Sequence, residues 1–276
     1  TGFGAWGSRS ASGTTLGYDH NARGISGGIT FDAGSDLNLG VSLGWADADI
    51  ELTDNGGGGD QSSLLGAISA RYAGRGFTLG GGLLYGKVDQ DTLRNVSFSG
   101  FSGSVAGETD SNLFGGFLGL GVPLGSSGGW SFNANASGSY IRQEQAGYTE
   151  SGTSPLRLQL GDLTTETIEG RAGLTAKTRL WQGNQGGGES PEALNLSVNL
   201  GGRFLGTLGE RELPVPFAVS GAGIVLQGDK RDFVQAQFGL GLDYTAPSGA
   251  QFSLGYRGEA GKASRHAVQA GVSFAF

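Results

Sequence analysis

The chain has 276 residues, 56 of them glycine, with 18 basic and 25 acidic side chains and a net charge of −7. The glycines follow no Gly-x-y period, which excludes a collagen helix, and the modest negative charge argues against nucleic acid as a partner. Cysteine is absent, so disulfides and thiolate sites are excluded, and no apolar run approaches the roughly 18 residues of a membrane helix. A membrane β-barrel stays possible, because its strands alternate apolar and polar residues.

Twelve stretches of alternating apolar and polar residues follow one another along the chain. Successive side chains of a strand point to opposite faces, so each stretch predicts a strand with one apolar face. Most have about 10–16 residues, which exceeds the ~5–6 usual in soluble sheets and suffices to cross a bilayer at a tilt. In chain order the predicted strands cover residues 2–10, 22–32, 37–50, 63–72, 77–92, 111–124, 130–145, 166–181, 194–205, 232–246, 250–261 and 265–276.

Short and long connections tend to alternate between these strands. Residues 33–36, 73–76 and 125–129 form short turns, whereas we expect long polar loops at 53–61, 94–110, 146–165 and 206–230. Short turns on one side and long loops on the other are typical of outer-membrane barrels. An even number of strands places both chain ends on the short-turn side, which is the periplasm.

Aromatic residues gather toward both ends of the predicted strands. Those at short-turn ends are Phe31, Phe77, Trp130, Tyr244, Phe252 and Phe276, and those near long-loop ends are Trp45, Tyr85, Tyr140, Phe204 and Tyr256. Two aromatic belts around an aliphatic middle are typical of a membrane barrel. The sequence therefore predicts an all-β fold: one transmembrane antiparallel up-and-down β-barrel of about 12 strands over residues 1–276, in the outer membrane.

The polar faces of the strands contain charges that such a barrel turns toward its lumen. The expected pore lining is Arg71, Glu169, Arg171, Lys177, Arg179, Arg203, Asp243, Arg257 and Glu259. These side chains can pair across strands and stiffen the barrel, or they can form a surface that binds or selects what passes. We expect no cofactor and no metal site, because neither His20 nor His266 has a ligand cluster nearby in the sequence.

Both ends of the chain contain aromatic segments in a particular order. These are residues 2–7 (GFGAWG), residues 16–19 (LGYD) followed by 24–29 (GISGGI), residues 252–258 (FSLGYRG) and residues 272–276 (VSFAF). In their order and spacing they resemble the β-domain of monomeric autotransporters, the type V secretion family of Gram-negative bacteria. The resemblance implies a monomeric export pore and anchor for an N-terminal passenger, without a catalytic role.

The resemblance also implies partners. The family's barrel-assembly machinery recognises the terminal strand, which assigns that signal here to Val272, Phe274 and Phe276. A linker segment joins the barrel to the passenger as a helix inside the lumen. Since the chain opens at its first predicted strand, we expect the helix and the passenger to be absent from this sequence. Outer-membrane lipid and lipopolysaccharide complete the expected partners.

Two other functions stay open at this stage. A barrel of similar strand number could be a small-solute channel. Alternatively, acidic residues near the long-loop ends could form the paired carboxylates of an outer-membrane hydrolase. The simpler interpretation of the same residues is a solvated rim that binds divalent cations and lipopolysaccharide. These residues are Asp47, Asp49, Glu51, Asp89 and Asp91. Residues 24–28 match the Gly-x-Ser-x-Gly nucleophile motif, but no helix is predicted after them, so we expect no catalysis there.

Overall fold

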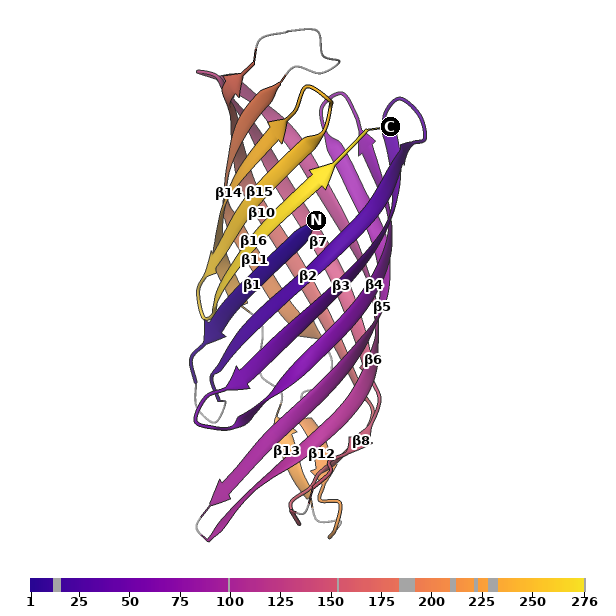
Figure 1. Cartoon of the computed structure of the whole chain (residues 1–276), viewed down its shortest axis with the longest axis vertical. Coiled ribbons are helices and arrows are strands. Elements are labelled where there is room, and N and C mark those ends of the chain that lie inside the picture. Colours follow the sequence, from indigo (N-terminus) through magenta and orange to yellow (C-terminus); the bar gives the residue numbers. More distant parts are fainter. Residues whose placement is uncertain are drawn as a thin grey trace.

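Twelve long strands close into one antiparallel barrel in the computed structural model, which describes residues 1–11, 16–98, 100–152, 154–183, 192–208, 212–220, 223–227 and 233–275 (Figure 1). Around the barrel the order is β1-β16-β15-β14-β11-β10-β7-β6-β5-β4-β3-β2. The predicted fold class and strand number are thus confirmed. The barrel strands are β1 (Gly2–Arg9), β2 (Tyr18–Asp32), β3 (Leu37–Leu52), β4 (Gly57–Ala73), β5 (Thr78–Phe98), β6 (Phe101–Ser127), β7 (Trp130–Gln145), β10 (Leu163–Gln182), β11 (Ala193–Leu208), β14 (Phe233–Thr245), β15 (Gln251–Ala260) and β16 (Ser264–Ser273).

The last strand closes the barrel against the first. β16 pairs with β1 from Gly2 opposite Ala270 to Ser8 opposite Ser264. Closure gives the edge strands a partner, as a membrane requires of every backbone polar group. The expectation that this strand continues to residue 276 is wrong: β15 begins at Gln251, opposite Ser273, so the ladder offers no partner beyond Ser273. Phe276 itself lies outside the described residues.

Most strands extend farther toward the long-loop side than the sequence predicts. In place of a loop at 53–61, a turn with Asp54 and Asn55 at φ 57° and 58° leads directly into β4. In place of a loop at 94–110, β5 and β6 continue as one hairpin as far as Phe98 opposite Phe101. A strand with polar side chains can continue into water as long as its backbone groups have hydrogen-bond partners in a neighbouring strand. Here β5 and β6 provide those partners for each other.

The apolar face of the barrel points outward. Leu43 is 65% exposed and Leu118 is 66% exposed, and the same face of the neighbouring strands shows further exposed aliphatic side chains. A continuous apolar surface of this extent is expected on a soluble monomer only as an interaction site, and on a membrane barrel it is the lipid-facing band. Within the described residues, no helix is long and apolar enough to cross a membrane.

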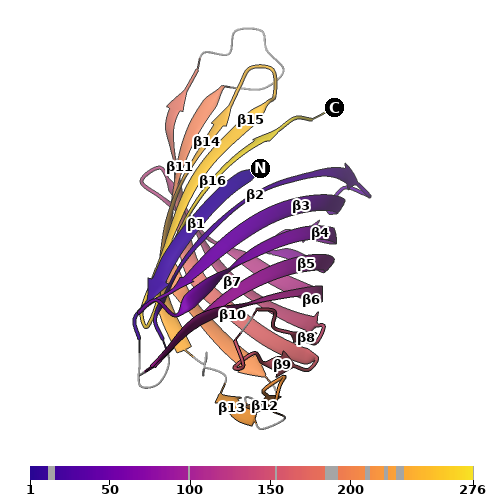
Figure 2. The same cartoon turned by 60° about the horizontal axis from the view of Figure 1, so that its bottom comes forward.

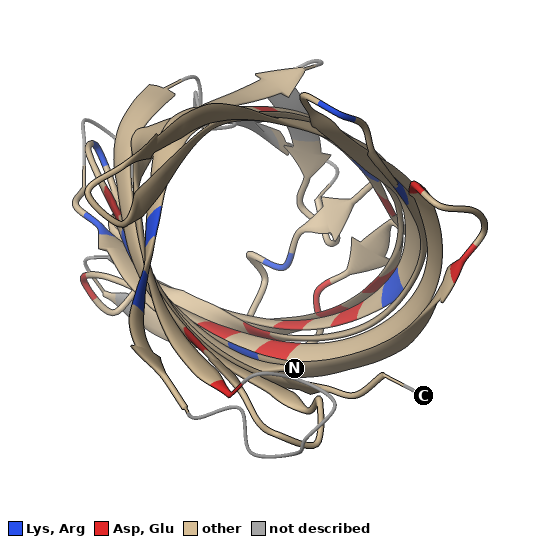
Figure 3. Cartoon of the chain, turned by 90° about the horizontal axis from the view of Figure 1, so that it is seen from above, with Lys and Arg blue, Asp and Glu red and all other residues tan. Residues whose placement is uncertain are grey.

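Two long connections fold back over one opening of the barrel. Two small sheets lie there: β8 (Tyr148–Thr149) with β9 (Gln159–Leu160), and β12 (Glu212–Pro216) with β13 (Gly223–Gln227). A backbone bridge between Leu158 and Phe217 joins the two connections. We call the described parts of residues 148–160 and 212–217 the cap. Figure 2 shows it at the long-loop end, and Figure 3 shows segments that cross part of the far opening.

Glu150 anchors the cap to the barrel wall. Both of its carboxylate oxygens accept hydrogen bonds from Arg94 of β5, at 2.9 and 2.6 Å, and one also accepts from the backbone N–H of Leu158 at 2.7 Å. Arg94 further donates to the carbonyl of Leu156. Glu150 is 5% exposed and the Arg94 side chain is about one-third exposed, so a half-buried ion pair holds the 150–158 segment against β5.

Candidate functional site

The polar face of β10, β11, β14 and β15 forms a charged wall inside the lumen. Arg171 of β10 lies 3.8 Å from Glu259 of β15, although β11 and β14 separate these two strands. Lys177 of β10 similarly reaches Asp243 of β14 at 3.1 Å, across β11. Side chains of non-neighbouring strands can meet in this way only on the concave side of a curved sheet. The wall therefore faces the lumen.

Arg203 is the centre of this wall. Its guanidinium donates to Glu169 at 2.6 and 2.8 Å, to Glu259 at 2.8 Å and to Gln235 at 3.3 Å. Arg171 donates to the other oxygen of Glu169 at 2.5 Å. Arg203 is 8% exposed and Glu259 is 3% exposed, so these charges are largely removed from water and offset one another through charge-assisted hydrogen bonds.

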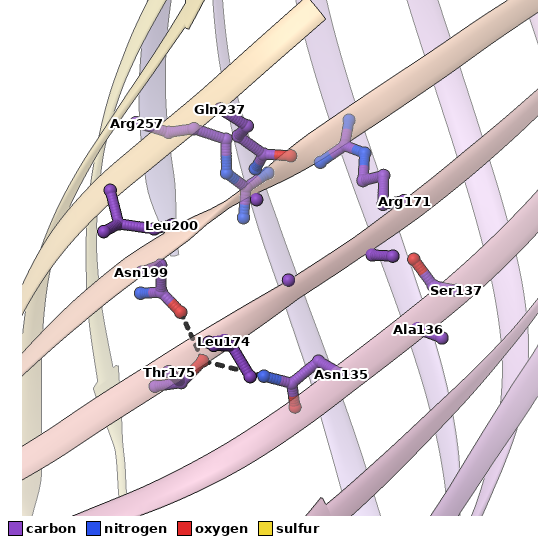
Figure 4. A pocket seen from close by; sticks show the side chains of 13 residues that line it. Asn135, Ala136, Ser137, Arg171, Leu174, Thr175, Asn199, Leu200, Gln237 and Arg257 are labelled. Carbon is purple, nitrogen blue, oxygen red and sulfur yellow. Dashed lines mark hydrogen bonds between the residues drawn. The ribbon is translucent and has the colours of Figure 1, made fainter. Parts of the chain in front are cut away.

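A cavity of about 360 Å³ lies beside the network, on its short-turn side (Figure 4). Its floor is formed by Gly173 and Gly201, which face each other across the β10–β11 ladder and have no side chains, so the cavity extends down to their backbones. Thr175 links the amides along its lower edge: it accepts from Asn135 at 2.8 Å and donates to Asn199 at 2.5 Å. Arg171, Arg257 and Gln237 line the upper part.

The nine residues of the expected pore lining all lie on the inward face. Glu169, Arg171, Arg203 and Glu259 share the network, and Arg257 lies next to it at the cavity. Lys177 and Asp243 form a separate pair nearer the short turns, where Arg179 donates to Gln182 at 2.6 Å. Arg71 lies on β4, where it lines a second hollow with Asn135 and Ser137. Their contact with exported polypeptide stays a prediction.

Sequence reasoning missed the uncharged members of this wall. Gln235, 2% exposed, bonds Arg203 on one side and donates to the carbonyl of Ala263 at 2.7 Å on the other. Asn135, Thr175 and Asn199 were missed as well. All four lie on the same face of their strands as the predicted charges. The alternation of the sequence therefore contained the information needed to place them in the lumen. Arg94 and Glu150 had no such signal, because their contact joins a strand to a distant connection.

The acidic residues noted near the long-loop ends lie on the outward face, beyond the aromatic belt. On β3 to β6 they oppose one another across the ladders: Asp49 with Asp60, Asp60 with Asp91, Asp91 with Glu108, and Asp89 with Asp110. We call these residues, with Asp47 and Glu51, the acidic belt. Like charges directly opposite each other are destabilising unless cations screen them. In the described part of the chain, no group of three or more His, Cys, Asp or Glu residues is arranged to hold a metal ion.

The residues of the expected assembly signal lie at the free end of the closing strand. Val272 is in β16 and Phe274 follows its last residue, and both side chains are exposed. The nucleophile-like stretch at 24–28 lies inside β2, where the N–H of Ser26 donates to the carbonyl of Thr1 at 2.7 Å. A strand in this position lacks the strand-turn-helix geometry of a nucleophile elbow.

A closed antiparallel barrel with a lipid-facing exterior and a charged lumen defines the class of transmembrane outer-membrane β-barrels. The family model described as the autotransporter beta-domain matches residues 1–257, so the chain belongs to this family. Members are outer-membrane barrels that anchor an N-terminal passenger and move it to the cell surface, and this is the function of the chain. Family membership decides between this function and the solute channel.

Solved structures show the same fold. The translocator domain of the autotransporter NalP from Neisseria meningitidis is 17% identical with a TM-score of 0.75, and the match covers 100% of this chain and 86% of that one. The β-domain of the Bordetella autotransporter BrkA is 18% identical with a TM-score of 0.68, covering 100% and 98%. The transport unit of AIDA-I from Escherichia coli is 13% identical with a TM-score of 0.50, covering 99% and 89%. No curated protein sequence matches the chain.

Proposed function

We propose that the charged wall of β10, β11, β14 and β15 lines the path of the polypeptide that the barrel exports. The observation that supports this path is the division of the barrel into an apolar exterior and an interior with paired charges and amides. Paired charges present hydrogen-bonding groups to a passing backbone, while their mutual pairing prevents any one of them from holding it tightly.

The test compares two neighbouring residues of β11 that point to opposite faces. Asn199 lines the lumen cavity. Leu200 also borders that cavity, but its side chain belongs to the alternate, outward face of the strand and is 64% exposed. With a reporter passenger fused before Thr1, Asn199→Trp should slow its appearance at the cell surface, because the added ring narrows the path. Leu200→Trp should leave export unchanged. Surface exposure is measured by protease treatment of intact cells, and barrel assembly by heat-modifiable gel mobility. Equal export by the two variants contradicts the proposed path.

The end of the closing strand is the proposed contact for the barrel-assembly machinery. Val272 and Phe274 present exposed apolar side chains beside an incomplete stretch of ladder, a combination suited to pairing with another strand. Removing residues 274–276 should reduce the amount of barrel in the membrane without changing the export rate per assembled barrel. Unchanged assembly of the truncated chain counts against this role.

The acidic belt is the proposed contact with lipopolysaccharide, through divalent cations that bridge carboxylates and lipid phosphates. We further propose that the barrel adds no covalent chemistry to export. Asp47→Asn and Asp89→Asn should therefore leave passenger display intact. A hydrolytic activity of the purified barrel that either change abolishes contradicts this proposal.

A further inference from the structure

Arg257 differs from Arg171 and Arg203, its neighbours in the charged wall, in having no direct acidic partner. Arg171 and Arg203 both bond Glu169, and Glu259 lies at 2.8 Å from Arg203. Among the described residues, none forms a hydrogen bond or an ion pair within 4.0 Å with the Arg257 side chain. Arg171, Arg203 and Arg257 thus have two carboxylates, Glu169 and Glu259, between them, and Arg257 is the one of the three without a direct contact to either.

The surroundings of Arg257 are those of a carboxylate site. The cavity it lines is floored by the paired glycines Gly173 and Gly201, so the ligand finds space rather than side chains there. Arg171 borders the same cavity and keeps it positive. The amides of Gln237 and Asn199 supply further hydrogen-bonding groups, and the hydrogen bond from Thr175 holds the Asn199 amide in place.

Planar guanidinium groups bind carboxylates through two parallel hydrogen bonds. Amides at the border of the site can donate further hydrogen bonds and so fix the orientation of the carboxylate. We propose that Arg257, with Arg171, Gln237 and Asn199 around it, is a subsite for a carboxylate side chain, an Asp or Glu, of polypeptide inside the lumen. The inference rests on the proposed export path and adds to it a preference: acidic residues pause at this point of the wall, and basic ones are repelled from it.

The test uses the purified full chain in detergent and three labelled synthetic peptides of about 20 residues, long enough to span the barrel as a helix. They are rich in Ala and Gln and differ at one central position, which is Glu, Gln or Lys. Fluorescence anisotropy gives the dissociation constant of each peptide. We expect the Glu peptide to bind about fivefold more tightly than the Gln peptide at low salt. The Lys peptide should bind more weakly than both, and raising the salt toward 1 M should remove the differences.

Arg257→Gln should abolish the preference for Glu. The matched control is Arg71→Gln, which removes the same charge from the lumen face of β4, and it should preserve the preference. Because the Arg257 side chain has no direct partner, its replacement should leave folding intact, as checked by heat-modifiable mobility. Equal affinities for the Glu and Gln peptides, no binding of any peptide, or equal loss in both variants overturns the subsite. In each case normal discrimination between Asn199→Trp and Leu200→Trp in the export assay leaves the proposed path in place.

Discussion

Arg203 concentrates much of the lumen's electrostatics in one side chain. Its guanidinium connects β11 with Glu169 of β10 and Glu259 of β15. The bond to Glu259, at 2.8 Å, is the shortest ion-pair contact of that carboxylate, and the bond to Glu169, at 2.6 Å, is second only to the one from Arg171. A buried carboxylate that loses its cation keeps the desolvation cost and loses the compensating attraction. The free energy of unfolding should therefore respond strongly to this position.

We expect Arg203→Gln to lower the free energy of unfolding by about 2 kcal/mol. Breaking a fully enclosed ion pair costs about 3–5 kcal/mol, and we expect a smaller value here because the lumen admits water to the carboxylates left behind. Urea titration in lipid vesicles, followed by tryptophan fluorescence, measures the change. Lys177→Gln is the control: it breaks a pair whose two side chains are each 44% exposed and should cost less than about 0.5 kcal/mol. Equal losses in both variants would show that the buried network has no special role.

Alternation in the sequence predicted which face each of these charges occupies, but not which of them touch. Contact depends on the register between neighbouring strands and on how far the wall curves. The ladders from β10 to β15 run without a shift around Arg203, but alternation along each single strand does not say which residues of the next strand they oppose. The charges on Arg203 and Glu259 were therefore predictable as inward residues, and their shared network was not.

At the scale of an element, β3 offers the clearest test of the two faces. Leu43 points to lipid and Ser42, its neighbour, points to the lumen side, opposite Gly28 of β2. Leu43→Arg should destabilise the folded barrel by about 2–4 kcal/mol, because it places a charge in the middle of the lipid-facing band. Ser42→Arg should cost much less, since the lumen hydrates the charge. Folding yield and urea midpoints in vesicles measure both. A greater cost for Ser42→Arg would reverse the assignment of the faces.

The cap is the element that sequence reasoning could least anticipate. Its residues lie in stretches predicted as long loops, and they are held by the Arg94–Glu150 pair over a sequence separation of 56 residues. We expect Glu150→Gln to loosen the cap, because a neutral amide cannot replace two charge-assisted bonds to Arg94 and the bond to the Leu158 N–H at once. Single-channel recordings should then show larger and less steady currents than the wild type.

Proteolysis gives a second measurement of how firmly the cap is held. Limited proteolysis should cut the 148–160 segment of Glu150→Gln sooner, while the barrel strands stay protected. Glu144→Gln provides the control, because Glu144 pairs with Arg142 on an exposed part of β7 outside the cap. Wild-type currents in Glu150→Gln, together with unchanged proteolysis, would mean that Glu150 does not hold the cap in place.

At the scale of the whole molecule, closure through β1 and β16 joins residues that are far apart in sequence. The Ser8 and Ser264 hydroxyl oxygens lie 3.2 Å apart at this seam. Cysteines at the two positions should therefore reach disulfide geometry without moving the backbone. Because the chain contains no native cysteine, the double variant Ser8→Cys/Ser264→Cys has one possible intramolecular disulfide. Oxidised in the membrane and then denatured, this nearly circular chain should migrate faster on a non-reducing gel, and reductant should reverse the shift.

The matched control moves one cysteine by a single residue. In Ser8→Cys/Arg265→Cys the second side chain points to the lumen while the first points outward, so the two thiols lie on opposite faces of the wall. Efficient cross-linking of the first pair with little in the second establishes both closure and register. Cross-linking of both pairs to the same extent would indicate a seam that slides. No cross-link in either pair, in a barrel that otherwise shows heat-modifiable mobility, would mean that the last strand does not close on the first.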